Sequence, residues 1–148
     1  PYKSRLSAGF SGPSRKSSET MFFPGYYLHL EFGNLMLGGG AYALDKENLH
    51  KIRTAIAQDP DSFRELADAP AFRAKYPEGL QGERNKVLPA EFKVPAASEP
   101  RIVQKQFYFM AEMDPETALR PDFADFVADY FRAGHDLNVY FRQIIGFQ

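Results

Sequence analysis

Three consecutive glycines, Gly38 to Gly40, lie inside LMLGGGAYAL, a run that otherwise reads as a β-strand. Glycine weakens a strand because it adds no side chain to pack and loses the most backbone freedom when the chain folds. A strand that keeps three glycines needs its backbone bare for a close approach. The sequence therefore predicts that a ligand or another part of the protein lies against this strip.

The glycine run forms one half of a predicted hairpin. The segments YYLHLEF and LMLGGGAYAL flank Gly33-Asn34, a dipeptide typical of tight two-residue turns. With that turn, residues 26–32 and 35–42 pair antiparallel, and His29 lies opposite Gly38. Because side chains alternate between the two sides of a sheet, one face is apolar and faces a core. This face carries Leu28, Leu30, Phe32, Leu35, Leu37 and Ala41.

On the other face of the hairpin, Gly38 and Gly40 form a bare floor. Its rim is predicted to consist of Tyr27, His29, Glu31 and Tyr42. A ligand reaches hydrogen-bonding distance of such a floor where any Cβ would obstruct it, so Gly38→Val is expected to fold nearly normally yet lose binding. The alternative is a packing seam, in which an aromatic ring or the helix expected over 46–58 covers the glycines.

Histidine and carboxylate side chains near this floor do not complete a known site. His29 and Glu31 point the same way, but a useful metal site needs a third ligand, and His50 and His135 have no recognisable metal spacing. The sequence predicts neither a metal nor another cofactor. His29 titrates in the range of a proton-transfer group, yet the sequence pairs it with no partner. Whether the protein is an enzyme stays open, and no catalytic residue is assigned.

Basic side chains form a second candidate group. Lys3 and Arg5 share one face of the strand expected over residues 2–10, and Arg53 lies beside the apolar stripe of the helix expected over 46–58. If they converge on the glycine floor they make an anion site, because arginine holds phosphate or carboxylate through paired donors. The alternative for each is a solvated or salt-bridged surface charge. The predicted ligand-binding residues are Lys3, Arg5, Tyr27, His29, Gly38, Gly40, Tyr42 and Arg53.

The whole chain, residues 1–148, is predicted to form a single α+β domain with a mainly antiparallel sheet and a central hairpin. Further strands are expected over 2–10, with Leu6, Ala8 and Phe10 on one face, and over 105–113. Helices are expected after Asp45, Pro60 and Pro70, with an irregular stretch over 77–100. A C-terminal helical pair over 121–145 is expected to break at Gly134, with Asp136 as the cap of the last helix.

Composition limits the function classes. With 18 basic and 19 acidic side chains, the chain has no global field that favours nucleic acid or an anionic membrane. No apolar run approaches the roughly 20 residues that span a bilayer, and no signal-peptide pattern is visible. The lack of cysteine excludes disulfides and thiolate metal sites and fits a reducing cytoplasm. We expect a cytoplasmic protein that binds neither nucleic acid nor membrane, and the oligomeric state is not predicted.

The order of the motifs PYKSRLSAGF, GYYLHLEFGNLMLGGGAYAL, LHKIRTAI and IVQKQFYF resembles the family called domain of unknown function 2461, found in bacteria and fungi. The resemblance covers essentially the whole chain. Its most specific elements are Pro1-Tyr2-Lys3, the Tyr26-Tyr27 strand leading to the three glycines, and Ile52-Arg53. In that family an Arg-Asp-x-Arg-Phe segment and an Asp-Lys pair precede the Pro-Tyr-Lys. The resemblance implies an α+β fold and the C-terminal part of a longer chain, but no reaction.

Two functions remain from this reading. The first is the binding of a small anionic molecule over the glycine floor. The alternative is a non-catalytic interaction or structural module whose aromatic surface docks a protein partner or a preceding segment of its own chain. Large exposed apolar patches would favour the alternative.

Overall fold

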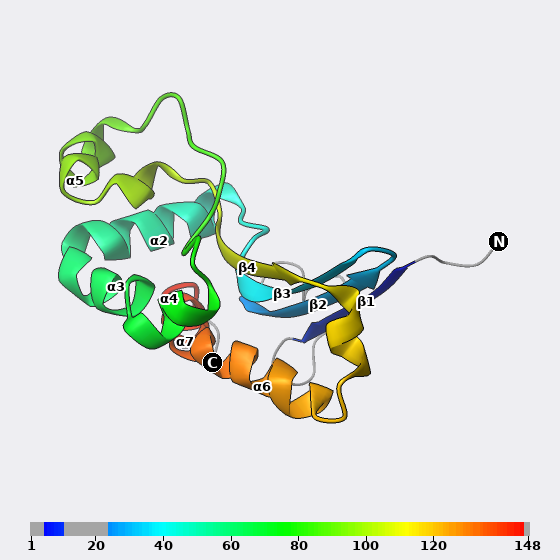
Figure 1. The fold of residues 1–148 in the computed structure, drawn as a ribbon. Coiled ribbons are helices and arrows are strands. Elements are labelled where there is room, and N and C mark those ends of the chain that lie inside the picture. Colours follow the sequence, from blue (N-terminus) through cyan, green and yellow to red (C-terminus); the bar gives the residue numbers. More distant parts are fainter. Residues whose placement is uncertain (1–4, 11–23, 147–148) are drawn as a thin grey trace.

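The computed structural model describes residues 5–10 and 24–146, which form an α+β fold (Figure 1). One antiparallel sheet has its strands in the order β1-β2-β3-β4. The strands are β1 (Arg5–Phe10), β2 (Gly25–Glu31), β3 (Asn34–Ala41) and β4 (Phe107–Met113). The predicted fold class, with its central hairpin and C-terminal helical pair, is confirmed.

The helices begin where the sequence supplies caps and prolines. They are α2 (Lys46–Gln58), α3 (Pro60–Ala67), α4 (Pro70–Lys75), α5 (Lys93–Ser98), α6 (Phe123–Ala133) and α7 (His135–Ile144). The Asp45 side chain accepts from the Asn48 N–H at 2.8 Å, and Asp59 caps α3 in the same way. Asp136 is not the cap of α7, because Gly134 ends α6 and serves as the first flanking residue of α7. The stretch over 77–100 also contains α5, which the sequence analysis missed.

Short 3-10 turns join these elements at η1 (Ala90–Phe92), η2 (Pro100–Val103) and η3 (Pro115–Leu119). In Figure 1, α6 runs below the sheet, and α2 to α5 gather at its left end. The core lies where these helices meet the sheet. It contains Ile52 and Ile56 of α2, together with Phe107 and Phe109 of β4 and Phe141 of α7.

The β2–β3 hairpin turns one residue earlier than predicted. Its two-residue turn is Phe32-Gly33, so Glu31 pairs with Asn34 and His29 pairs with Met36 instead of Gly38. Gly33, the second residue of this turn, has φ +87°, a backbone conformation that glycine adopts without strain. The pairing shifts by two residues, which keeps side chains on their predicted faces. Phe32 is the exception, because it lies in the turn and is 98% exposed instead of core-facing.

The apolar face of β1 is less covered than its sequence pattern predicted. Leu6 is 63% exposed and Phe10 is 50% exposed. Among the described strands, β1 pairs only with β2 and lies at the end of the sheet order. The Phe10 side chain of β1 contacts Phe131 of α6, with ring centroids 5.8 Å apart.

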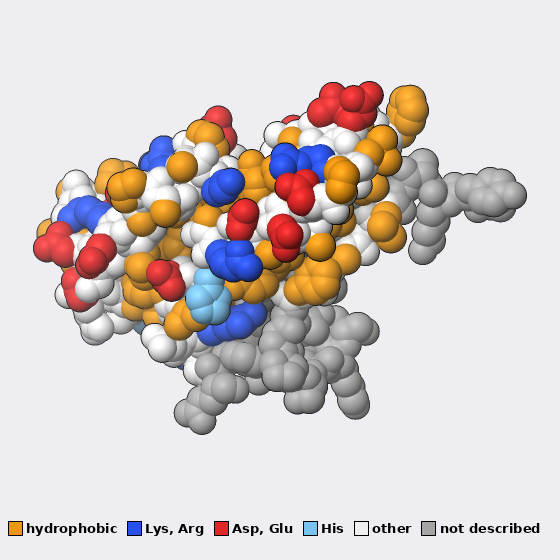
Figure 2. All heavy atoms as spheres, turned by 60° about the horizontal axis from the view of Figure 1, so that its bottom comes forward, with side chains coloured by type: hydrophobic (Ala, Val, Ile, Leu, Met, Phe, Trp, Pro, Cys, Tyr) orange, Lys and Arg blue, Asp and Glu red, His pale blue; other side chains and the backbone are white. Residues whose placement is uncertain are grey.

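Charges of both signs are spread over the described surface. On the face shown in Figure 2, acidic, basic and hydrophobic side chains are interspersed, and neither sign of charge gathers into one large patch. Among the described residues, no helix is long and apolar enough to cross a membrane.

Candidate functional site

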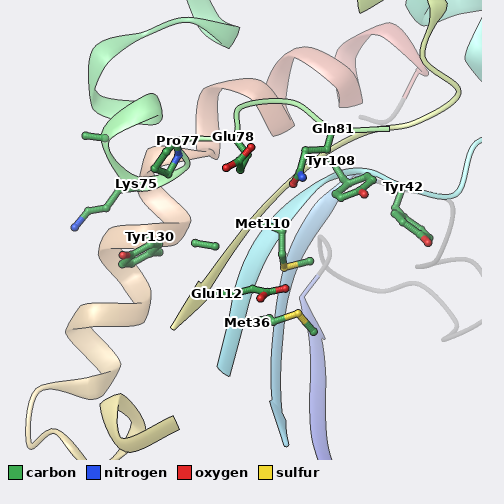
Figure 3. A pocket seen from close by; sticks show the side chains of 12 residues that line it. Met36, Tyr42, Lys75, Pro77, Glu78, Gln81, Tyr108, Met110, Glu112 and Tyr130 are labelled. Atoms are coloured by element: carbon green, nitrogen blue, oxygen red, sulfur yellow. The ribbon is translucent and has the colours of Figure 1, made fainter. Parts of the chain in front are cut away.

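A groove of about 710 Å³ runs along β4 (Figure 3). One wall comes from the sheet and consists of Met36, Tyr108, Met110, Ala111 and Glu112. The opposite side comes from α4 and the loop after it, with Ala74, Lys75, Pro77, Glu78 and Gln81. Tyr42, just after β3, and Tyr130 of α6 complete the lining.

The groove follows the edge of β4 and does not open on one face of the sheet alone. Met110, Ala111 and Glu112 are consecutive in the strand and all line it. Successive side chains of a strand point to opposite faces, so three neighbours share one groove only when it runs along the strand edge. Figure 3 shows this edge facing Lys75 and Tyr130 across the groove.

The groove contains polar groups that lack partners among the described residues. Lys75, Glu78 and Glu112 form no ion pair with a described side chain. The Lys75 ammonium instead lies 4.8 Å from the centroid of the Tyr130 ring. Oε1 of Gln81 is buried and accepts no hydrogen bond from a described group. Such atoms are rare in folded proteins, and functional sites are among the places where they occur.

The three glycines are required by neighbouring backbone. A Cβ on Gly38 would collide with the carbonyl oxygen of Phe109 and lie 2.9 Å from Sδ of Met110. A Cβ on Gly39 would collide with the carbonyl oxygen of Gly25, and Gly40 has φ +97°. The expectation that Gly38→Val folds nearly normally is therefore wrong. The strip serves as a packing seam on both faces of β3, and Met110 covers it beside the groove.

Asn138 of α7 is a buried polar residue that the sequence analysis missed. Its Oδ1 accepts the Gly40 N–H at 3.0 Å, and its Nδ2 donates to the Gly25 carbonyl oxygen at 2.9 Å. The side-chain amide thus bridges β2 and β3 where those two residues pair. The position of Asn138 beside the buried Leu137 is the sequence feature that could have indicated this inward contact.

The structure places His29 in a polar cluster on β1 and β2. Its Nδ1 lies 2.5 Å from Oγ of Ser7 and 3.1 Å from Oη of Tyr27, and its Nε2 lies 3.3 Å from Glu31. A hydroxyl, an imidazole and a carboxylate also make up the triad of serine hydrolases, but there the hydroxyl faces Nε2 and the carboxylate faces Nδ1, the reverse of the contacts of His29. His29 is also only 6% exposed, and none of these residues lines the groove. The cluster and the groove are neighbours through Met36, which pairs with His29 and also lines the groove.

The other predicted site residues lie in different places. Tyr42 lines the groove, with its ring 5.2 Å from that of Tyr108. The Arg53 guanidinium is buried and donates to the carbonyl oxygens of Ile102 at 2.8 Å and Gln104 at 3.0 Å. Burial lowers the pKa of this guanidinium. Arg53 thus holds the C-terminal end of η2 and does not line the groove. Lys3 and the side chain of Arg5 lie outside the described residues.

The residues that sequence reasoning missed are those of the groove walls. In KQFYFMAEM, Tyr108, Met110 and Glu112 alternate with the buried Phe107 and Phe109, and this alternation indicates a shared face. It does not indicate that β4 pairs with β3. Within the described part of the chain, no three His, Asp or Glu side chains are arranged to hold a metal ion.

Comparison with known proteins identifies the family of this chain. No curated protein and no solved structure matches it significantly. The family model described as "Conserved hypothetical protein (DUF2461)" matches residues 1–140. With nearly the whole length matched, and with the glycine strip and both strands of the hairpin inside the matched range, the chain belongs to the DUF2461 family.

Proposed function

We propose that this domain binds a small amphoteric organic molecule, one that carries both an acidic group and an amine, in the groove along β4. The observation that carries the proposal is the buried Oε1 of Gln81, which has no partner among the described residues in the wall of that groove. The amide of Gln81 suits a ligand N–H or O–H donor.

The charges of the groove support an amphoteric ligand. Lys75 suits the acidic group of the small anionic molecule expected from the sequence, in place of Arg53, whose donors are used within the fold. Glu78 and Glu112 suit an amine. Tyr42, Tyr108 and the two methionines offer apolar and aromatic surface to the body of the ligand.

A cytoplasmic location remains part of this proposal, and it rests on the absence of cysteine. The second candidate function is a protein-interaction module. It is favoured by the exposure of Leu6 and Phe10 on β1, which leaves apolar side chains at the end of the sheet.

The proposal is tested by titrating isotope-labelled protein with amino acids, dipeptides, phosphorylated metabolites and carboxylated metabolites. We expect amphoteric compounds to shift the NMR signals of the Gln81 side-chain amide and of Tyr108 and Met110. Gln81→Met removes the acceptor at nearly constant volume, and it should weaken the binding by about tenfold.

Gln143→Met is the matched control, because Gln143 is exposed on α7 and should leave binding unchanged. Thermal unfolding checks that both variants fold. If no compound shifts a groove resonance, or if both variants bind like the original chain, the groove is not a binding site.

A further inference from the structure

The outer edge of β4 pairs with another segment of the chain at Tyr108, but not further along the strand. The Gln81 N–H donates to the Tyr108 carbonyl oxygen at 2.7 Å, and the Tyr108 N–H donates to the Gln81 carbonyl oxygen at 3.1 Å. This antiparallel bridge shows that the backbone groups of Tyr108 point away from β3.

The hydrogen bonds of β3 agree with that direction. Gly40, which pairs with Tyr108, directs its N–H to Asn138 on the β2 side of the sheet. In an antiparallel ladder the backbone groups of alternate residues point the same way. The N–H and C=O groups of Met110 and Glu112 therefore also point outward, and no described backbone group outside the sheet bonds to them.

The segment that covers Tyr108 turns away before it reaches Met110. Gly79 has φ +65°, and its N–H closes a turn onto the Tyr76 carbonyl oxygen at 2.9 Å. Beyond this turn, the groove takes the place of a neighbouring strand. Lys75 and Glu78 line its far side, and Met110 and Glu112 line the strand edge.

We propose that the groove binds an extended peptide as a fifth strand, antiparallel to β4, which bonds to the backbone groups of Met110 and Glu112 and pairs a basic side chain with Glu112. The proposal rests on the groove being the binding site of the proposed function, and it names the class of ligand. Addition of a strand to an open sheet edge is a recurring mode of peptide recognition, in which main-chain bonds give affinity and alternate side chains give specificity.

The antiparallel direction continues the bridge between Gln81 and Tyr108. The peptide residue opposite Glu112 lies on the same face as that carboxylate, and opposite charges across two strands stabilise the pair. Glu78 adds a second carboxylate to the groove. The next peptide residue, opposite Ala111, points to the other face, where Tyr130 offers an aromatic ring. The preferred ligand is therefore a basic residue followed by an apolar one in an extended segment.

A pentapeptide with a blocked amino terminus and a free carboxylate, acetyl-Ser-Thr-Lys-Leu-Thr, is the probe, because it carries both the amine and the acidic group of the proposed ligand. Its lysine is placed opposite Glu112, its leucine opposite Ala111 and its last threonine opposite Met110. On binding, we expect the NMR signals of the Met110 and Glu112 amides to shift and their hydrogen exchange to slow. Glu112→Gln should weaken this peptide several-fold and leave a norleucine-for-lysine peptide unchanged.

Two methylated peptides separate strand addition from other binding, and they need no change in the protein. N-methylation of the last threonine removes the N–H that faces Met110, and it should cost about tenfold or more in affinity. N-methylation of the leucine alters an N–H that points away from β4, and it should change the affinity by no more than about twofold. Equal effects of the two methylations would overturn the proposal.

The remaining outcomes are also distinct. Binding of small amphoteric compounds at the groove without binding of the peptide would overturn strand addition and leave the proposed function standing. Failure of both would remove both proposals. If sedimentation shows a dimer, and the Met110 amide is protected from exchange in that dimer, the edge pairs with a second copy of the chain. That result would overturn the peptide proposal. If the protein is monomeric and the open edge binds neither peptide nor small compound, both proposals fall. Glu78 and Glu112 then only protect the edge from aggregation.

Discussion

Two charged regions of this molecule differ in how their charges are compensated. Beside α3 and η2, the Arg101 guanidinium donates to the buried Glu99 at 2.7 Å and to both carboxylate oxygens of Asp68, at 2.9 and 3.0 Å. Arg64 adds a contact of 3.4 Å to Glu99. In the groove, Lys75 and the two carboxylates have no such partners among the described residues.

The difference separates charges that maintain the fold from charges that remain available. Glu99 is 3% exposed, so its carboxylate depends on Arg101 and Arg64 to compensate for the loss of water. The charges of the groove keep contact with solvent and contribute little to the free energy of unfolding. Substitutions in the first region should therefore change stability, and substitutions in the second should change binding.

The largest effect is expected for Arg101→Ala. It leaves the buried Glu99 with Arg64 alone and removes the guanidinium that lies 4.9 Å from the Phe63 ring. We expect the free energy of unfolding to fall by about 3 kcal/mol in urea titrations. Lys75→Ala, in the groove, should change it by no more than about 0.5 kcal/mol. Similar losses in the two variants would break the comparison.

An intermediate effect is expected at Gly38, which pairs with Met110 of the groove wall. It sharpens the comparison, because it separates the packing of the strands beside the groove from the groove charges. Gly38→Ala places a Cβ against the Phe109 carbonyl oxygen and Met110, so β3 and β4 must move apart. We expect a loss of about 2 kcal/mol, measured by the same urea titrations.

Gly9→Ala in β1 is the matched control, because no described atom lies within 4 Å of its added Cβ. It should leave the free energy of unfolding within about 0.5 kcal/mol of the original. If Gly38→Ala is equally harmless, the glycine strip is not kept by packing.

The smallest effect is expected from pH. Burial raises the pKa of Glu99, but the hydrogen bonds and charge of Arg101, with the charge of Arg64, outweigh it and hold that pKa below its ordinary value. The hydrogen bond from Arg101 likewise lowers the pKa of Asp68 against the opposing effect of burial. A carboxylate with a lowered folded pKa stabilises the protein above its unfolded pKa. The stability is lost as pH falls from about 4.3 through the folded pKa.

Urea midpoints between pH 5 and pH 3 measure this loss. Protonation leaves the side chains in place, so the change should be smaller than that of Arg101→Ala. Glu99→Gln should flatten the pH dependence, whereas Glu112→Gln in the groove should preserve it. A flattened profile for Glu112→Gln would show that the groove also contributes to acid stability.

Local rules were sufficient for most of the fold. Asp45 and Pro60 placed the starts of α2 and α3, and the alternation of 105–113 placed β4. The sequence did not fix the turn, because Phe32-Gly33 and Gly33-Asn34 both offer a glycine, and only the observed pairing of Glu31 with Asn34 distinguishes them. The burial of β1 was overestimated, since strand periodicity does not reveal how far the helices extend over it.

The candidate site was predicted only in part. Of the residues predicted to bind a ligand, Tyr42 lines the groove, and Gly38 pairs with Met110 of the groove wall. The wall from Lys75 to Gln81 depends on how a loop passes the edge of β4, which no local pattern records. Arg53 was assigned to an anion site, yet a helical position beside an apolar stripe also suits a buried guanidinium that holds backbone carbonyls.

The pairing of β3 with β4 has a consequence for the order of folding. The β2–β3 hairpin closes through a two-residue turn, whereas Ala41 pairs with Phe107 across the whole of residues 42–106. Pairings between distant segments carry a larger loop-closure entropy and slow the folding of a chain. The groove borders this distant pairing, so its walls meet late in folding. In pulse-labelling hydrogen exchange, the amides of the hairpin should gain protection early, and those that β4 contributes to its ladder with β3 should gain it last.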